Sequence, residues 1–162
     1  MASDQATLSW GVKQSFRAYV EGAGGVIEVG AGATRTEDGG FRFAAAPGAG
    51  LTRGADGRPG GTGGFVGEVR FEAHGGMLNV FFADPAVEIG PAGAAITVAD
   101  SPARDIRVEL AVLDMSAATE ADGGWVIPAK LSRDGWRVLG DHYPQMTPLD
   151  PVRLTFSPGS AD

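Results

Sequence analysis

Few side chains in this chain can bind a transition metal. The sequence holds two histidines, His74 and His142, and two tyrosines, Tyr19 and Tyr143, and it contains no cysteine. Imidazole nitrogens and phenolate oxygens are ligands for iron and related metals. The lack of cysteine excludes a disulfide, a thiolate metal site and a cysteine nucleophile. Transition-metal binding would therefore depend mainly on these four residues.

The positions of Ser15 and Tyr19 draw attention to one helical face. They are four residues apart in a segment whose apolar residues recur every three to four positions, which is the helical period. The two hydroxyls would lie one turn apart on the same face. The pattern leaves two interpretations of Tyr19 open: a polar group presented for binding, or a core residue whose hydroxyl reaches solvent. His74 also has two interpretations: a polar hairpin residue, which is the more common case for such a pattern, or a metal ligand or the partner of one.

No motif in the sequence indicates catalysis. The glycines at 30 and 32 precede Thr36-Glu37-Asp38 rather than a helix, so they do not form a dinucleotide-binding loop. There is no nucleophile elbow and no Walker sequence, and no spacing singles out a pair of carboxylates as acid and base. The glycine-rich stretch lacks the regularly spaced aspartates of a calcium-binding repeat. We therefore predict that the protein is not an enzyme.

One helix is expected to position Tyr19. Apolar residues recur at helical spacing across Thr7 to Val20, after a cap at Thr7 or Ser9 and before the glycines at 22, 24 and 25. Further along the chain, apolar residues alternate and turn residues recur every eight to twelve positions, which indicates an all-β fold. The expected strands are Val26–Val29, Phe41–Ala44, Phe65–Ala73, Met77–Phe82, Val87–Ile89, Ala94–Ala99, Ile106–Leu113, Trp125–Leu131 and Val152–Phe156. Nine strands are enough for an antiparallel β-sandwich.

A tight hairpin is expected to position His74. Residues 65–73 alternate between apolar and polar side chains, which is typical of a half-buried antiparallel strand. Gly75 and Gly76 can adopt the positive φ angles of a short turn before the next strand. His74 should therefore lie at the strand end, on the more polar face.

Length and charge limit the organisation and the partners. A chain of 162 residues that is 43% hydrophobic should form one domain, residues 1–162, with a mobile glycine-rich loop at 46–64. A net charge of −7 argues against nucleic acid as a partner, because phosphate backbones are bound by cationic surfaces. No apolar run is long enough to cross a membrane, and the first residues lack the order of a signal peptide.

Four stretches of the sequence together resemble the HtaA domain, a bacterial haem-binding module of surface haem-uptake proteins. They occur in the same order and extend from Leu8 to Thr155, nearly the whole chain. The stretches are Leu8-Ser9-Trp10-Gly11-Val12-Lys13-Gln14-Ser15-Phe16-Arg17-Ala18-Tyr19, Phe65-Val66-Gly67-Glu68-Val69-Arg70-Phe71-Glu72-Ala73-His74-Gly75-Gly76-Met77-Leu78, Asp84-Pro85, and Tyr143-Pro144 with Thr147-Pro148-Leu149-Asp150-Pro151-Val152-Arg153-Leu154-Thr155.

The resemblance implies a fold and a haem site. The fold would be an antiparallel β-sandwich of about nine to eleven strands with one or two short α-helices. Tyr19 matches the axial iron ligand, His74 its hydrogen-bond partner and Ser15 a haem-propionate contact. Tyr143 matches a second propionate contact, although the residues around it depart from the family pattern near Met146. We expect the Tyr19 oxygen to be open to solvent and within about 10 Å of the His74 imidazole.

The chemistry of these residues suits ferric protoporphyrin IX. A phenol has an ordinary pKa near 10, so ferric iron must lower it to hold the phenolate at neutral pH, and the anionic oxygen then favours Fe(III). Ser15, Tyr143 or Arg17 could donate to the propionates. Apolar side chains would cover the macrocycle faces. The candidates, each with a competing interpretation as core, are Phe16, Val20, Met77, Phe81, Phe82 and Met146.

The function expected from the resemblance is haem capture for uptake, transport or transfer, outside the cell or at its surface. The sequence leaves a cytoplasmic location open. Only His142 remains for distal acid–base chemistry, and nothing places it there. A haem-donor protein or a membrane haem receptor would be a partner, and a homodimer is compatible with the sequence. One rival function is an adhesion or interaction domain without haem, and another is a glycan hydrolase.

Overall fold

The structure is a computed structural model that describes residues 5–46, 51–53, 58–91, 93–100, 106–121, 124–139 and 143–157. Strands and short helices account for most of these residues. The strands are β1 (Gln5–Trp10), β2 (Val26–Gly30), β3 (Thr34–Arg35), β4 (Phe41–Ala45), β5 (Thr52–Arg53), β6 (Pro59–Val66), β7 (Glu68–Ala73), β8 (Leu78–Gly90), β9 (Gly93–Ala99), β10 (Arg107–Leu113), β11 (Thr119–Ala121), β12 (Gly124–Leu131) and β13 (Pro148–Ser157). The helices are α1 (Gln14–Gly22), α2 (Trp136–Leu139) and the 3₁₀ turns η1 (His74–Gly76) and η2 (Met115–Ala117).

Eight of the strands close into an antiparallel β-barrel. Their order is β8-β9-β10-β12-β13-β1-β4-β6, and β6 pairs back onto β8 from Gly61 opposite Ile89 to Gly64 opposite Ala86. The expected β-sandwich is therefore wrong. Alternation predicts that one face of each strand is buried, but a second sheet and the same sheet curled on itself bury that face equally well. Irregularities in the pairing of β8, β10 and β12 allow the sheet to curl.

The barrel interior is filled by large apolar side chains. On β1, Leu8 and Trp10 point inward and are buried, whereas Thr7 and Ser9 between them are half-buried on the outer face. The rings of Trp10 and Phe82 are 6.4 Å apart between centroids, and those of Phe43 and Phe82 are 6.1 Å apart. These buried side chains form the core of the barrel.

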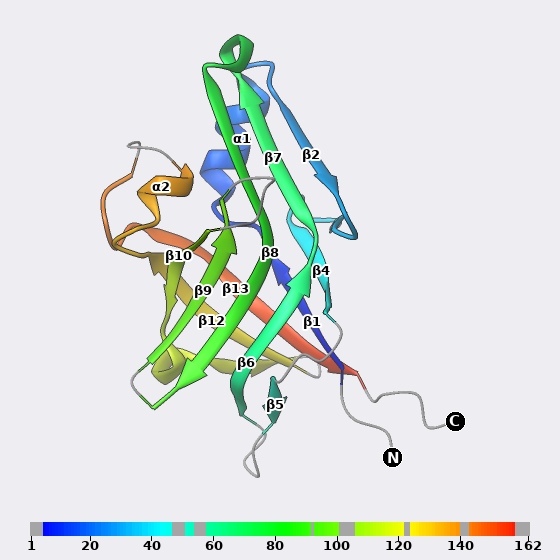
Figure 1. Cartoon of the computed structure of the whole chain (residues 1–162), viewed down its shortest axis with the longest axis vertical. Coiled ribbons are helices and arrows are strands. Elements are labelled where there is room, and N and C mark those ends of the chain that lie inside the picture. Colours follow the sequence, from blue (N-terminus) through cyan, green and yellow to red (C-terminus); the bar gives the residue numbers. More distant parts are fainter. Residues whose placement is uncertain are drawn as a thin grey trace.

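Five further strands pair with the barrel strands or with one another; β5 pairs with β6, and two others, β7 and β2, form an extension at one end. One part of the long strand β8 pairs with β6 in the barrel wall, and the other part pairs with β7 beyond the barrel. The other edge of β7 pairs with β2. In Figure 1 the β7–β8 hairpin rises above the barrel, with α1 behind it and β2 beside it. The other two added strands, β3 and β11, pair with β4 and β12.

Gly67 and Asp84 mark the level at which the chain passes from the barrel to the extension. Gly67 lies between β6 and β7 with φ of 141°, and Asp84 lies in β8 with φ of 50°. The Asp84 N–H donates to the Gly67 carbonyl at 2.7 Å, and the Gly67 N–H donates to Asp84 Oδ1 at 3.3 Å. A Cβ at Gly67 would lie 2.6 Å from the Cβ of Ala33. This pair of hydrogen bonds fixes the direction of the extension relative to the barrel.

The expected helix over Thr7 to Val20 is half wrong. Its first half is β1, which pairs with β13 and β4, and the helix begins at Gln14 after Val12, whose φ is 64°. Leu8 fits both the helical spacing and the strand alternation, and pairing with two strands far away in the sequence decides for the strand. The helix ends among the predicted glycines, where the Gly25 N–H donates to the Val20 carbonyl at 2.9 Å.

The glycine-rich loop expected at 46–64 is also wrong in part. Residues 59–64 belong to the barrel strand β6, and Leu51 is buried. A Cβ at Gly63 would lie 2.5 Å from the Cβ of Leu51, so glycine there lets Leu51 cover the strand. Residues 47–50 and 54–57 of this loop lie outside the described part of the chain.

The nine predicted strands all lie within observed strands or overlap them, but their limits differ. Met77–Phe82 and Val87–Ile89 are parts of one strand, β8, because the backbone irregularity at Asp84 bends the strand without ending it. The short strands β3, β5 and β11 were not predicted. Among the described residues, no helix has the length and apolar character needed to span a membrane.

Candidate functional site

The helix α1 packs its apolar face against the extension. Phe16 and Val20 are buried, and the Phe16 ring lies 5.0 Å from that of Phe71 on β7. At the helix end, a Cβ on Gly25 would lie 2.2 Å from the Glu72 carbonyl oxygen, so glycine permits the close approach to β7. This docking leaves the opposite helical face, with Ser15 and Tyr19, exposed.

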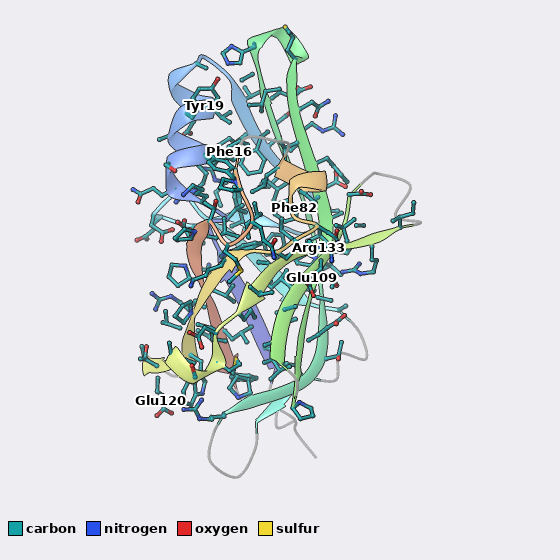
Figure 2. The ribbon with its side chains drawn as sticks, turned by 90° about the vertical axis from the view of Figure 1, so that its left-hand side faces the viewer. Phe16, Tyr19, Phe82, Glu109, Glu120 and Arg133 are labelled. Atoms are coloured by element: carbon teal, nitrogen blue, oxygen red, sulfur yellow. The ribbon has the colours of Figure 1, made fainter. Side chains whose placement is uncertain are left out.

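Tyr19 and His74 meet at the end of the extension. The Tyr19 hydroxyl and His74 Nε2 are 2.7 Å apart, and the two ring centroids are 5.7 Å apart. The Tyr19 side chain is 50% exposed, so its oxygen is open to solvent, as expected. Figure 2 shows Tyr19 toward the C-terminal end of α1, farther from the barrel than Phe16 and Phe82. A phenol in this position can donate to an unprotonated Nε2, and a phenolate can accept from a protonated one.

The β7–β8 hairpin presents His74 through an unusual backbone. His74, Gly75 and Gly76 have φ of 56°, 67° and 95°, so three consecutive residues are left-handed. Left-handed backbone is uncommon for residues other than glycine, although histidine is among those that tolerate it best. The imidazole therefore leaves the alternation of β7 and projects from the hairpin tip, next to Met77, which is 92% exposed.

Ser15 and Tyr143 lie next to this pair. The edge of the half-buried Tyr143 ring packs on Phe16, with centroids 6.2 Å apart and planes at 80°. Burial raises the pKa of Tyr143 above its usual value of 10.0, the Ser15 hydrogen bond opposes this shift, and nearby Tyr19 adds to it. Tyr143 is therefore a neutral phenol at physiological pH. The ammonium of Lys13 lies 5.4 Å from the Tyr143 ring centroid.

The remaining predicted contacts divide into core and surface. Phe16, Val20 and Phe82 are buried in the core, Phe81 is half-buried with Arg70 over its ring, and Met77 and Met146 are exposed. The buried side chains face inward and are not available to a ligand on the surface. Met77, which follows the hairpin tip at His74, is exposed and could cover one face of a macrocycle bound there. His142 lies outside the described residues.

Arg17 does not point toward the Tyr19 side of the helix. Its side chain is 9% exposed, its Nε donates to the Gly11 carbonyl at 3.0 Å, and its Nη2 forms an ion pair with Asp150 at 3.2 Å. The other Asp150 oxygen accepts from the Gln14 N–H at 3.0 Å. Arg17 thus attaches α1 to β13 instead of presenting a donor for propionates. The sequence does not indicate this ion pair, because 133 residues separate Arg17 from Asp150.

The site residues therefore come from three segments. Ser15 and Tyr19 come from α1, His74 and Met77 from the hairpin tip, and Tyr143 from the segment before β13. Lys13 is an addition that the sequence did not suggest, since nothing local marks a lysine that approaches a ring 130 residues away. Within the described residues, no three histidine, aspartate or glutamate side chains gather into a metal site.

Comparisons with known proteins agree on the family. The HtaA family, described as Htaa, matches residues 5–155. The N-terminal domain of HtaA from Corynebacterium glutamicum is 26% identical with a TM-score of 0.69, covering 97% of this chain and 99% of that domain. The C-terminal domain of the same protein is 24% identical with a TM-score of 0.72, covering 98% and 99%.

A third solved structure has the same fold. The protein described as "Heme binding protein HtaB" from Corynebacterium glutamicum is 20% identical with a TM-score of 0.67, covering 98% of this chain and 96% of that one. No curated protein matches the sequence. Because the family match includes nearly all of the barrel, the extension and the helix, this chain belongs to the HtaA family.

Proposed function

We propose that this protein binds ferric haem, with the Tyr19 oxygen as axial iron ligand and His74 as the residue that orients it. The observation that carries the proposal is the 2.7 Å contact between the Tyr19 hydroxyl and His74 Nε2 on an exposed surface. Membership of the HtaA family and the fold shared with a protein described as heme-binding give further support.

His74 suits a second role during binding, which is to receive a proton. The phenol must lose its proton when it binds iron, and an unprotonated Nε2 at hydrogen-bond distance can accept it. The resulting Nε2–H then donates to the phenolate, which fixes the ring orientation and moderates how strongly the oxygen donates to iron. Haem itself would supply the ferric centre and a large apolar surface.

Ser15, Tyr143 and Lys13 suit the propionates. Tyr143 remains a neutral donor at physiological pH, Ser15 is exposed beside it, and Lys13 adds a cation next to the Tyr143 ring. Because a carboxylate is charged, hydrogen bonds from these groups to a propionate are stronger than hydrogen bonds between two neutral groups. The macrocycle would thus extend from the Tyr19–His74 pair toward the first turn of α1.

Capture and transfer fit this surface better than turnover. An exposed ligand pair lets a donor or acceptor protein reach the haem, whereas catalysis on bound oxygen needs a walled distal pocket. We therefore propose a role in haem uptake, transport or transfer at the cell surface or outside the cell. Exchange would take place with a haem-donor protein or a membrane receptor. A variant of the C-terminal domain of HtaA is described as a domain-swapped dimer, which supports a homodimer as a further assembly to test.

Haemin titration followed by absorbance tests the ligand assignment. The wild-type protein should change the Soret band with saturation at one haem per chain, and Tyr19→Phe should remove most of this change because it deletes only the oxygen. Tyr143→Phe is the matched control, which removes the other phenol oxygen and should keep the tyrosinate spectrum. If Tyr19→Phe and the wild type give the same spectrum and affinity, Tyr19 is not the ligand.

A second titration separates iron ligation from apolar binding. Metal-free protoporphyrin IX has the same macrocycle and propionates but no iron, so the wild type and Tyr19→Phe should bind it equally. His74→Ala should weaken haemin binding less than Tyr19→Phe, because the ligand itself remains. Failure of the wild type to bind haemin at all would favour an adhesion or interaction domain.

A further inference from the structure

A hollow of about 670 Å³ lies on the opposite side of α1 from Tyr19. Its floor is the outer face of β4, β1 and β13, and its walls are the start of α1 and the turn between β3 and β4. The lining is polar and contains four arginines, at 17, 35, 42 and 153, and three acidic residues, at 37, 38 and 150. The hollow therefore carries a positive balance in a chain whose net charge is −7.

Two of these arginines are arranged on either side of a serine. Ser9 on β1 lies directly opposite Arg42 on β4 and directly opposite Arg153 on β13. Residues paired in this way point to the same face, so all three side chains point out of the barrel into the hollow. With neighbouring strands about 4.8 Å apart, the two arginine Cα atoms are about 10 Å apart, and both guanidinium groups can reach one ligand between them.

Neither guanidinium is neutralised in the described part of the chain. Arg42 and Arg153 are exposed and have no hydrogen bond or ion pair with any described residue. The other two arginines differ, because Arg17 is paired with Asp150 and Arg35 donates to the Gly39 carbonyl at 2.8 Å. The arrangement thus separates two structural arginines from two that remain available to a ligand.

The acidic residues of the hollow do not supply the missing partners. Asp150 is engaged by Arg17 and by the Gln14 N–H. Asp38 is held within its own turn by Thr36 and by the Gly40 N–H, and these hydrogen bonds keep the pKa of Asp38 below 3.8. The Asp38 carboxylate is therefore engaged within its own turn. Of the three acidic residues that line the hollow, Glu37 alone is not accounted for by these contacts.

From this geometry we propose that Arg42, Ser9 and Arg153 form a binding site for a small soluble oxyanion, a phosphate or carboxylate group. A guanidinium binds such a group through two parallel N–H donors, and the serine hydroxyl adds a donor between the two arginines. The overall negative charge opposes an extended polyanion such as nucleic acid or an anionic membrane. The site is independent of the Tyr19–His74 pair, which lies on the other face of α1.

Titration with inorganic phosphate, followed by ¹H–¹⁵N NMR, tests the site. We expect saturable shifts of the amides of Ser9, Arg42 and Arg153 and of the two guanidinium Nε–H signals, with sodium chloride at equal ionic strength as the reference. Arg42→Gln and Arg153→Gln should each weaken phosphate binding by roughly tenfold or more. Arg133→Gln is the matched control, because Arg133 is an exposed arginine in the turn before α2 and does not line the hollow.

Further arms separate the sources and guard against misfolding. Citrate in place of phosphate tests the carboxylate, and saturable binding of either anion supports the site, whereas binding to phosphatidylglycerol vesicles alone would overturn it. Arg42→Lys, which keeps the charge but loses the fork, should bind between wild type and Arg42→Gln. Tyr19→Phe should keep full phosphate binding. Shifts that never saturate, equal those caused by chloride, or survive in both glutamine variants would also overturn the proposal.

Discussion

At the scale of single residues, Tyr19 and Tyr143 have the same side chain but different environments, and the environments give the two phenols different chemistry. Tyr19 is half exposed and touches an imidazole, so its proton has an acceptor when a metal arrives. Tyr143 is half-buried against Phe16, and burial raises its pKa, so it keeps its proton. One phenol is suited to ligate and the other to donate.

Removing the Tyr143 oxygen should therefore change haem retention and leave ligation unchanged. Tyr143→Phe keeps the ring contact with Phe16 and deletes the hydroxyl near Ser15, so we expect haem to dissociate a few-fold faster, equivalent to less than about 1 kcal/mol. Transfer of haem to excess apomyoglobin, followed by absorbance, measures this rate. An equal rate for Tyr143→Phe and the wild type would exclude Tyr143 as a propionate contact.

Acid should release haem through the ligand oxygen. A bound phenolate competes with protons, so affinity is highest at neutral pH and falls as pH decreases, because protonation at low pH regenerates the neutral phenol. Following the Soret band from pH 7 to about pH 4 measures the loss. Residual haemin binding by Tyr19→Phe should lack this step, and a pH response that is identical in the two proteins would contradict ligation by Tyr19.

Sequence was informative about these residues because their signals are local. The four-residue spacing placed Ser15 and Tyr19 on one exposed face, and two glycines after His74 placed the imidazole at a hairpin tip. The proximity of Tyr19 to His74 is observed, while their roles toward haem remain proposals. The attachment of Arg17 to Asp150 could not be predicted, because it joins segments that meet only after the barrel closes.

At the scale of elements, α1 depends on its attachments at both ends. Gly25 allows the end of the helix to approach β7, while Asp150 on β13 accepts from the Gln14 N–H at its start and pairs with Arg17. Carboxylates at the first turn also interact favourably with the helix dipole. The direction in which Tyr19 points thus depends on Gly25 and Asp150, at the two ends of the helix.

Loss of the Asp150 charge should loosen the helix. Asp150→Asn weakens the contacts to Gln14 and Arg17 and leaves the buried guanidinium without its counter-charge, so we expect a loss of about 2 kcal/mol in the free energy of unfolding. Urea unfolding measures the change. Asp134→Asn, at an exposed turn position, should stay within about 0.5 kcal/mol of wild type. Equal unfolding midpoints for the two variants would show that the ion pair does not hold the helix.

The strand predictions located most elements and missed how they assemble. Alternation correctly located the buried face of β7, but the closure of the barrel depends on pairing between β6 and β8. Residues 59–64 of β6 resemble a loop in the sequence, because their glycines carry no side chains. The packing of Leu51 over Gly63, which requires a glycine there, is a tertiary contact that local sequence does not indicate. Local pattern thus identified strands and could not distinguish a barrel from a sandwich.

At the scale of the whole molecule, the barrel and the extension have separate tasks. The barrel has a packed interior and a closed ring of hydrogen bonds, so it is a rigid support. The extension ends at an open edge, β2, and at the exposed hairpin tip, with fewer buried contacts than the barrel. We infer that any ordering on ligand binding is centred on α1, the β7–β8 hairpin and the segment that carries Tyr143.

Hydrogen exchange should locate this ordering and thermal unfolding should measure it. Haemin should slow the fast, local amide exchange in residues 14–22 and 68–83, which contribute to the Tyr19–His74 site, whereas the slowest amides of β12 and β13 should gain only the protection that follows from the higher global stability. At free haemin one hundred times Kd, the linkage term is about 2.7 kcal/mol, which raises Tm by about 5–10 °C for a chain of this size. Tyr19→Phe binds haemin more weakly, so at the same haemin concentration it should show both effects to a smaller extent. The absence of added protection in residues 14–22 and 68–83, or the same rise in Tm for Tyr19→Phe, would show that the extension is not the binding site for haemin.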